Sequence, residues 1–223
     1  MRRQIIGATA ACALLLTGCV SRVVPPPAAA ASGSTATSGF RGDYLPNPIR
    51  LSPAAARQPF TVASGGRVGG DVTLGQLQAA HPLLLVYFGY TNCPDECPTI
   101  MANLGVALRS LPVASQKQVE VAFVTSDPRR DTPAALGRWL TNFDVGLPVP
   151  FAGLNAPVAT VDPLAGTLGV PLSPPVTKAD GTVDVEHGTQ VLAFRHGQAD
   201  LVWLSDATPA DLEHDIPRLL ASA

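Results

Sequence analysis

The sequence predicts an α/β fold in which a central mixed sheet is flanked by helices. Three observations lead to this prediction. Apolar runs typical of buried strands alternate with helical patterns, two short strands separated by a tight turn come late in the sequence, and a last helix follows them. A length of 223 residues with 46% hydrophobic content is enough for one domain with a substantial core.

The first predicted strand covers residues 83–89 (LLLVYFG), a continuous apolar run suited to a strand that is buried on both faces. A helix is predicted over residues 98–111, because apolar residues recur there at helical spacing, for example at Ile100 and Leu104. Residues 119–125 form the next apolar run and the next predicted strand. A strand, a helix and a strand in this order favour a sheet that is rich in parallel pairs.

The middle of the chain continues the alternation. Thr132-Pro133 places a capping hydroxyl before a proline suited to a first helical turn, which predicts a helix over residues 134–143. A strand near residues 149–154 and a helix near residues 156–168 follow. Pro163 lies inside that helix and is expected to interrupt it, because proline lacks the backbone N–H of a helical hydrogen bond.

The end of the chain predicts a hairpin and a helix. Residues 190–194 and 200–204 are strand-like and flank the turn residues 196–198. Thr208-Pro209 repeats the capping pattern and begins a last helix, which we expect Pro217 to kink. A closing hairpin followed by a helix is typical of thioredoxin-like domains, so the predicted class is an α/β, thioredoxin-like fold.

The N-terminus predicts a bacterial export signal over residues 1–18. Two arginines, a short apolar stretch and the residues LTGC follow one another, and the apolar stretch is too short to span a bilayer. LTGC resembles the site at which a lipoprotein signal is cut and its cysteine acylated, so Cys19 is the predicted lipidation site. The alternatives are a cleaved secretory signal with an incidental cysteine, or a short anchor helix.

We expect residues 19–58, which are rich in Ala, Pro and Ser, to form a disordered linker, and residues 59–223 to form the folded domain. The expected location is extracytoplasmic, with membrane contact only through the lipid anchor. The formal net charge of −2 and the lack of a run of basic residues exclude nucleic acid as a partner, because binding it requires many neutralised phosphates.

Cys93 and Cys97, in the stretch TNCPDECPT, are the two cysteines left once the signal and the lipidated residue are set aside. They are too close together to make a good structural disulfide, because such a bridge stabilises mainly by closing a long loop. Pro98 suits a first helical position, which would make Cys97 the cap of the helix and place Cys93 on the turn before it. The helix N-terminus would favour reactive thiolates there.

Two alternatives remain open for this pair from the residues alone. If residues 93–97 form one helical turn, the two Cα atoms lie roughly 6 Å apart, which permits a disulfide and also permits both sulfurs to bind one metal. Soft thiolates suit Cu(I), and an imidazole would complete a three-ligand site that also accepts Cu(II). A structural zinc site would normally require a fourth protein ligand.

Three motifs occur in a fixed order on this pattern: YFGYTNCPDECP (residues 87–98), VTSDPRRDTP (124–133) and VEHGTQVLAF (185–194). Together they resemble the SCO/SenC family of copper-binding proteins for cytochrome oxidase assembly, over about residues 59–222. This chain has Glu-His-Gly at residues 186–188, where that family usually has Asp-His-Ser or Asp-His-Thr.

The resemblance implies copper, as Cu(I) or Cu(II), bound by Cys93, Cys97 and His187. It also implies a supporting role for Asp127 next to the ligands. The protein would then be a metallochaperone that delivers copper to the copper-site subunit of cytochrome c oxidase. Other copper chaperones are possible further partners. This hypothesis requires the fold to bring the imidazole of His187 within bonding reach of the two sulfur atoms.

The rival hypothesis is an extracytoplasmic thiol:disulfide oxidoreductase that reduces the cysteines of the oxidase copper site or of other partners. Cys93 would attack, Cys97 would resolve the mixed disulfide, and a thiol reductant would restore the pair. Whether the protein is an enzyme therefore stays open at this point. A thiol peroxidase on the same fold is a weaker alternative, because Thr91 is available near the cysteines but no arginine is placed by a motif.

Overall fold

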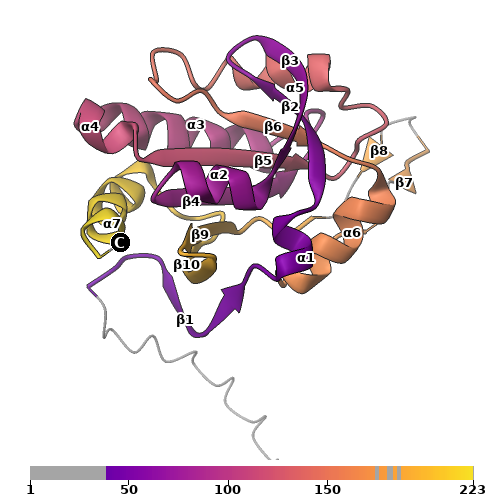
Figure 1. Cartoon of the computed structure of the whole chain (residues 1–223). Coiled ribbons are helices and arrows are strands. Elements are labelled where there is room, and N and C mark those ends of the chain that lie inside the picture. Colours follow the sequence, from indigo (N-terminus) through magenta and orange to yellow (C-terminus); the bar gives the residue numbers. More distant parts are fainter. Residues whose placement is uncertain (1–38, 174–175, 180–182, 185–186, 223) are drawn as a thin grey trace, which may run out of the picture. The chain divides into compact units, whose positions relative to one another are not determined.

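The computed structural model describes residues 39–173, 176–179, 183–184 and 187–222 (Figure 1). Across these residues an eight-stranded mixed sheet has the order β1-β10-β9-β4-β5-β6-β2-β3. The strands are β1 (Asp43–Arg50), β2 (Pro59–Ser64), β3 (Arg67–Thr73), β4 (Leu83–Gly89), β5 (Val119–Thr125), β6 (Ala152–Asn155), β9 (Val191–Arg195) and β10 (Gln198–Trp203). The helices are α1 (Pro53–Ala56), α2 (Leu74–Ala80), α3 (Glu96–Ser110), α4 (Val113–Gln116), α5 (Pro133–Leu140), α6 (Val158–Thr167) and α7 (Pro209–Ala221). The short strands β7 (Val176–Thr177) and β8 (Val183–Asp184) pair with each other.

The centre of the sheet is parallel and its flanks are antiparallel. β4 pairs in parallel with β5, from Leu83 opposite Val119 to Gly89 opposite Thr125, and β5 pairs in parallel with β6. β9 runs antiparallel to β4, and β2 runs antiparallel to β6. The sheet is therefore the mixed sheet that the sequence predicts.

Two hydrophobic cores lie on opposite faces of this sheet. The side chains of α3, α5 and α7 pack in one core, and those of α2 and α6 pack in the other. Every residue of β4 and of β5 is buried, as expected for central strands that are covered on both faces. Because side chains alternate along a strand, Leu85 and Tyr87 of β4 face the α3 side, whereas Val86 and Phe88 face the other.

The sequence predictions of the central elements are confirmed. The strands over residues 83–89 and 119–125 have the predicted bounds, and the hairpin and last helix are present as β9, β10 and α7. The expectation that Pro163 interrupts its helix is wrong, because α6 continues through Pro163. α7 also continues through Pro217, and the kink expected there stays a prediction. Both prolines are exposed, so water can solvate the carbonyl groups that lose a helical partner.

The expected linker of residues 19–58 ends too late. β1 pairs with β10 at the edge of the sheet, and α1 follows it, so residues 43–56 belong to the folded domain. The reason is that strand pairing uses backbone groups, which do not depend on the apolar composition that the prediction relied on. The sequence prediction also passed over β2, β3 and α2.

The predicted signal of residues 1–18, Cys19 and the first part of the linker lie outside the described residues. Among the helices that the structure describes, none is both long enough and apolar enough to cross a membrane.

Candidate metal centre

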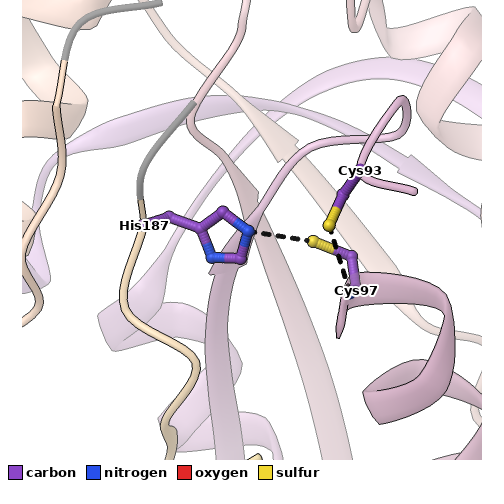
Figure 2. Close-up of side chains that lie close together, drawn as sticks. All are labelled: Cys93, Cys97 and His187. Atoms are coloured by element: carbon purple, nitrogen blue, oxygen red, sulfur yellow. Dashed lines mark hydrogen bonds between the residues drawn. The ribbon is translucent and has the colours of Figure 1, made fainter. Parts of the chain in front are cut away.

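Cys93, Cys97 and His187 lie together at one end of the sheet (Figure 2). Their ligand atoms are all within 4.8 Å of one another, and Cys97 Sγ lies 3.3 Å from His187 Nε2. The cysteines come from the junction of β4 and α3, and the histidine follows β8, 90 residues after Cys97. The fold therefore brings together the three residues that the family resemblance names.

The turn between β4 and α3 positions the two sulfur atoms. The backbone N–H of Cys93 donates to the carbonyl of Tyr90 at 3.2 Å, which folds the chain back toward the helix. α3 begins at Glu96, so Cys97 is its second residue. The sequence had predicted Cys97 as the cap of this helix, and that prediction is wrong. The Cys97 N–H donates to Cys93 Sγ at 3.4 Å, and this sulfur thereby satisfies one of the free N–H groups of the helix N-terminus.

Backbone contacts with residues 171–172 hold His187 in place. It forms an isolated β-bridge with Leu172, and the N–H of Gly188 donates to the carbonyl of Pro171 at 2.8 Å. His187 Nδ1 lies 3.0 Å from the carbonyl of Gly188, which accepts a hydrogen bond when Nδ1 carries the ring proton. In that tautomer, the lone pair of Nε2 faces the cysteines and is available to a metal.

Gly188 accounts for part of the departure from the usual family pattern. A Cβ atom at this position would lie 2.3 Å from Gln190 Oε1 and 2.9 Å from Val170 Cγ1. A serine or threonine would therefore have to displace both side chains. The glycine fits this loop because the loop packs closely against its neighbours.

The two thiols differ in their protonation. The hydrogen bond from Cys97 lowers the pKa of Cys93 to about 3, with contributions from His187 and the backbone N–H groups of Cys97 and Asp95. Burial raises the pKa of Cys97, and the neighbouring Cys93 sulfur raises it further. Burial lowers the pKa of His187, but hydrogen bonds to Cys93 and Gly188 outweigh that effect, so the net direction is upward. Cys93 is therefore a thiolate at neutral pH, and Cys97 retains its proton.

Exposure separates the two sulfurs in the same way. Cys93 is half-buried, whereas Cys97 is fully buried, and both are free thiols. Cys93 is therefore the more accessible of the two cysteines. His187 is also half-buried, so the three donors form a site near the surface and not an enclosed cavity.

Two residues next to the site were not singled out by the sequence. The buried hydroxyl of Tyr87 donates to Cys97 Sγ at 3.4 Å. The carboxylate of Asp131 accepts from the N–H and the hydroxyl of Thr91, at 2.9 and 2.5 Å, and from the hydroxyl of Thr125 at 2.7 Å. Asp131 is the second aspartate of the DPRRD stretch, and its position in that motif was the available signal.

Asp127, the first aspartate of that stretch, lies beside other groups. Its carboxylate accepts a hydrogen bond from Arg130 Nε, and its backbone N–H donates to Thr125 Oγ1 at 3.0 Å. The structure thus connects Asp127 to its own loop and to the end of β5. A supporting role for Asp127 at the metal ligands stays a prediction.

The remaining histidines lie elsewhere. His81 Nδ1 is 3.6 Å from Glu120 Oε2, and His214 Nδ1 is 2.7 Å from Asp215 Oδ1. His196 is exposed in the turn between β9 and β10. Among the described residues, Cys93, Cys97 and His187 form the one group of three or more potential metal ligands whose donor atoms converge. Two sulfurs and one imidazole are a donor set that suits copper.

Comparison with known proteins agrees with this geometry. The family model described as SCO1/SenC matches residues 54–221. A "Putative copper-binding protein" of Stutzerimonas stutzeri is 33% identical over 103 residues, which are 46% of this chain and 48% of that protein. "Protein SCO1, mitochondrial" of Saccharomyces cerevisiae is 41% identical over 59 residues, which are 26% of this chain and 20% of that protein. The matches thus span less than half the length of either relative.

Solved structures extend the similarity to most of the domain. The structure of Bradyrhizobium japonicum ScoI with copper bound has a TM-score of 0.59 and 27% identity, and the match covers 73% of this chain and 98% of that one. The apo Sco1 protein from Thermus thermophilus has a TM-score of 0.63 and 28% identity, over 84% of this chain and 99% of that one. The fold, the order of the motifs and the family match agree, and the chain belongs to the SCO1/SenC family.

Proposed function

We propose that this protein is a copper metallochaperone that binds one copper ion through Cys93, Cys97 and His187. The observation that carries the proposal is the convergence of the three donor atoms within 4.8 Å. Copper is also bound in the structures of two family members, ScoI of Bradyrhizobium japonicum and yeast Sco1. Copper is the cargo here, and it would be delivered to the copper site of cytochrome c oxidase.

The arrangement of the ligands supports transfer as well as binding. Cys93 offers a thiolate at the surface, and Cys97 must lose its proton before both sulfurs can bind the metal. Because the site is near the surface and has three protein ligands, a partner thiolate can enter the coordination sphere before a ligand of this chain leaves. Copper can then move between proteins by ligand exchange without being released into solution.

The proposed location follows from the proposed partner. A lipid on Cys19 would hold the domain on the outer side of a bacterial membrane, where it could meet the oxidase. Another copper chaperone would supply the metal there.

An anaerobic Cu(I) titration of the reduced domain tests the binding proposal. We expect one copper per domain, and a loss of affinity of about a hundredfold or more in Cys93→Ser and in His187→Ala, since loss of a group that merely supports a ligand costs 10- to 100-fold. Competition with a chromophoric Cu(I) chelator measures the affinities. His196→Ala, at an exposed turn, is the control and should bind as the unaltered protein does. Unchanged stoichiometry and affinity in both ligand variants would remove the proposal.

A second candidate function is a thiol:disulfide oxidoreductase, and the asymmetry of the two thiols favours it. The half-buried Cys93 thiolate would attack a partner disulfide, form a mixed disulfide and release one partner thiolate. Cys97 would then attack Cys93 Sγ, release the second partner thiolate and leave a Cys93–Cys97 disulfide. A thiol reductant would have to restore the dithiol.

His187→Ala separates the two functions. It should abolish tight copper binding, but it should leave most of the rate at which the dithiol reduces a model disulfide. The copper-loaded protein should also transfer copper to the reduced copper-site domain of the oxidase subunit. A His187→Ala protein that reduces disulfides normally, together with a wild-type protein that transfers no copper, would favour the reductase.

A further inference from the structure

The hydroxyl group of Tyr87 contacts a candidate metal ligand from the interior of the protein. It lies in β4 on the α3 side of the sheet and is fully buried. Its hydroxyl donates a hydrogen bond to Cys97 Sγ at 3.4 Å. A tyrosine hydroxyl in a hydrophobic core needs a partner, because an unpaired buried polar group destabilises the fold. The partner that the structure provides is a sulfur atom of the metal centre.

The surrounding packing holds this contact in place. A Cβ atom at Gly89 would lie 2.7 Å from Cys97 Sγ and 2.8 Å from Tyr87 Cε1, so the glycine leaves the space in which sulfur and ring meet. The Phe123 ring lies against the Tyr87 ring at a centroid distance of 5.8 Å. The His187 ring is perpendicular to the Tyr87 ring, with centroids 6.0 Å apart. Tyr87 is therefore confined to a position in which its hydroxyl faces the sulfur.

A hydrogen bond to this sulfur acts differently on its chemical states. A reduced cysteine sulfur carries more electron density than a disulfide sulfur, so it accepts a hydrogen bond more strongly. Hydrogen bonds to cysteine sulfurs likewise tune the potentials of metal centres that they ligate. The Tyr87 hydroxyl should therefore stabilise the dithiol relative to the disulfide, and should reduce the charge that Cys97 donates to a bound metal.

We propose that Tyr87 is a positioning residue of this centre, which sets the balance between dithiol and disulfide and tunes the Cys97–copper bond through its hydrogen bond to Cys97 Sγ. The copper part of this inference rests on the proposed function. The thiol part does not, because it concerns the metal-free protein.

The decisive experiment uses Tyr87→Phe, which removes the hydroxyl and keeps the ring. The metal-free protein is equilibrated without oxygen at pH 7 in mixtures of glutathione and glutathione disulfide. The Cys93 thiolate and the Cys97 thiol lose two electrons and one proton as their S–S bond forms. One glutathione disulfide takes up these electrons, this proton and one proton from the buffer, and is cleaved to two glutathione thiols. We expect Tyr87→Phe to shift the equilibrium constant toward the protein disulfide by about tenfold, which equals about 30 mV for this two-electron couple.

Tyr90→Phe is the matched control, because its ring is also perpendicular to His187, at a centroid distance of 5.5 Å. Its equilibrium should change by less than about threefold, and unchanged far-ultraviolet circular dichroism should show that both variants fold. An unchanged equilibrium in Tyr87→Phe would overturn the inference. So would a shift toward the dithiol, or an equal shift in Tyr90→Phe.

The copper arm separates this inference from the proposed function. Tyr87→Phe should still bind one copper per domain, and the sulfur-to-Cu(II) absorption band should move to longer wavelength, because the sulfur becomes a stronger donor. If the wild-type protein binds no copper, the proposed function fails, while the glutathione equilibrium still decides the role of Tyr87. If copper binds and the equilibrium of Tyr87→Phe is unchanged, only the inference about Tyr87 fails.

Discussion

Two aspartates of one motif have different structural roles. Asp131 is 1% exposed and links Thr91, two residues before Cys93, to Thr125 at the end of β5. Asp127 is 4% exposed and contacts Arg130 in its own loop. Asp131 is thus the residue that ties the cysteine loop to the sheet. Removing its carboxylate leaves the N–H and hydroxyl of the half-buried Thr91 and the buried hydroxyl of Thr125 without their acceptor.

This difference predicts that the two aspartates affect copper binding unequally. Asp131→Ala should weaken Cu(I) binding by about 10- to 100-fold, as loss of a group that orients ligands typically does. The contacts of Asp127 oppose the supporting role that the family resemblance implies for it, so Asp127→Ala should weaken binding by less than about threefold. Both should lower the free energy of unfolding by about 1–3 kcal/mol. Chelator competition measures the first quantity and urea denaturation the second. Equal copper affinities in the two variants would show that Asp131 does not hold the loop for binding.

The same residues show how far a sequence predicts a site. Cys93, Cys97 and His187 could be named because their chemical types and motifs mark them directly. The roles of Tyr87 and Asp131 could not, since they act through contacts with residues up to 40 positions away. A tyrosine in an apolar strand is an ordinary core residue until the sulfur beside its hydroxyl is known.

At the scale of elements, the junction of β4 and α3 is closely packed around the candidate ligands. β4 ends at Gly89, and the Ser126 N–H from the next loop donates to the Gly89 carbonyl at 2.7 Å. Any side chain at residue 89 would enter the space that Cys97 Sγ, Tyr87 and Phe123 occupy. The end of the strand therefore sets the position of the first turn of the helix.

Gly89→Ala should consequently disturb both the fold and the centre. Overpacking of this kind costs about 1–3 kcal/mol of unfolding free energy, and displacement of the Cys97 sulfur should also weaken copper binding. Gly166→Ala is the control, because a Cβ atom there meets nothing within 4 Å in α6 and alanine favours a helix. It should raise stability by about 0.5–1 kcal/mol. Urea denaturation measures the unfolding free energies of both variants, and equal values would contradict the packing argument.

Elements were predicted well where apolar residues form a clear pattern in the sequence, and poorly where they do not. β4 and β5 are continuous apolar runs because both faces of each strand are covered. β1 is mostly exposed and β3 has two glycines, so neither carries an apolar pattern. Both lie at the edges of the sheet and depend on backbone pairing, which residue composition does not reveal.

At the scale of the whole molecule, a buried carboxylate connects the two ends of the described domain. Asp215 of α7 is 0% exposed and accepts hydrogen bonds from the N–H groups of Arg41 and Gly42, at 2.9 and 2.8 Å. It also accepts from Trp203 Nε1 in β10 at 3.0 Å. The segment that precedes β1 is therefore fixed against the last helix, although β1 itself has little buried apolar surface.

A second buried carboxyl group has the opposite effect on global stability. Glu120 of β5 is 6% exposed, and its Oε1 atom has no hydrogen-bond partner among the described residues. Burial raises its pKa to about 8, so the group holds its proton in the folded protein at neutral pH. The 3.6 Å contact with His81 Nδ1 is then not an ion pair.

The sign of the resulting pH dependence follows from proton binding. Between the ordinary pKa of 4.5 and about 8, the folded state keeps a proton at Glu120 that the unfolded state releases, so stability falls as the pH rises through this range. Glu120→Gln removes this titration. At pH 8 it should be more stable than the wild type by about 2–4 kcal/mol, and near pH 4.5 the two should agree within about 1 kcal/mol. Urea unfolding from pH 4.5 to 8 measures the difference, in which the titration of other groups cancels. A constant offset between Glu120→Gln and the wild type at every pH would show that Glu120 does not keep its proton on folding.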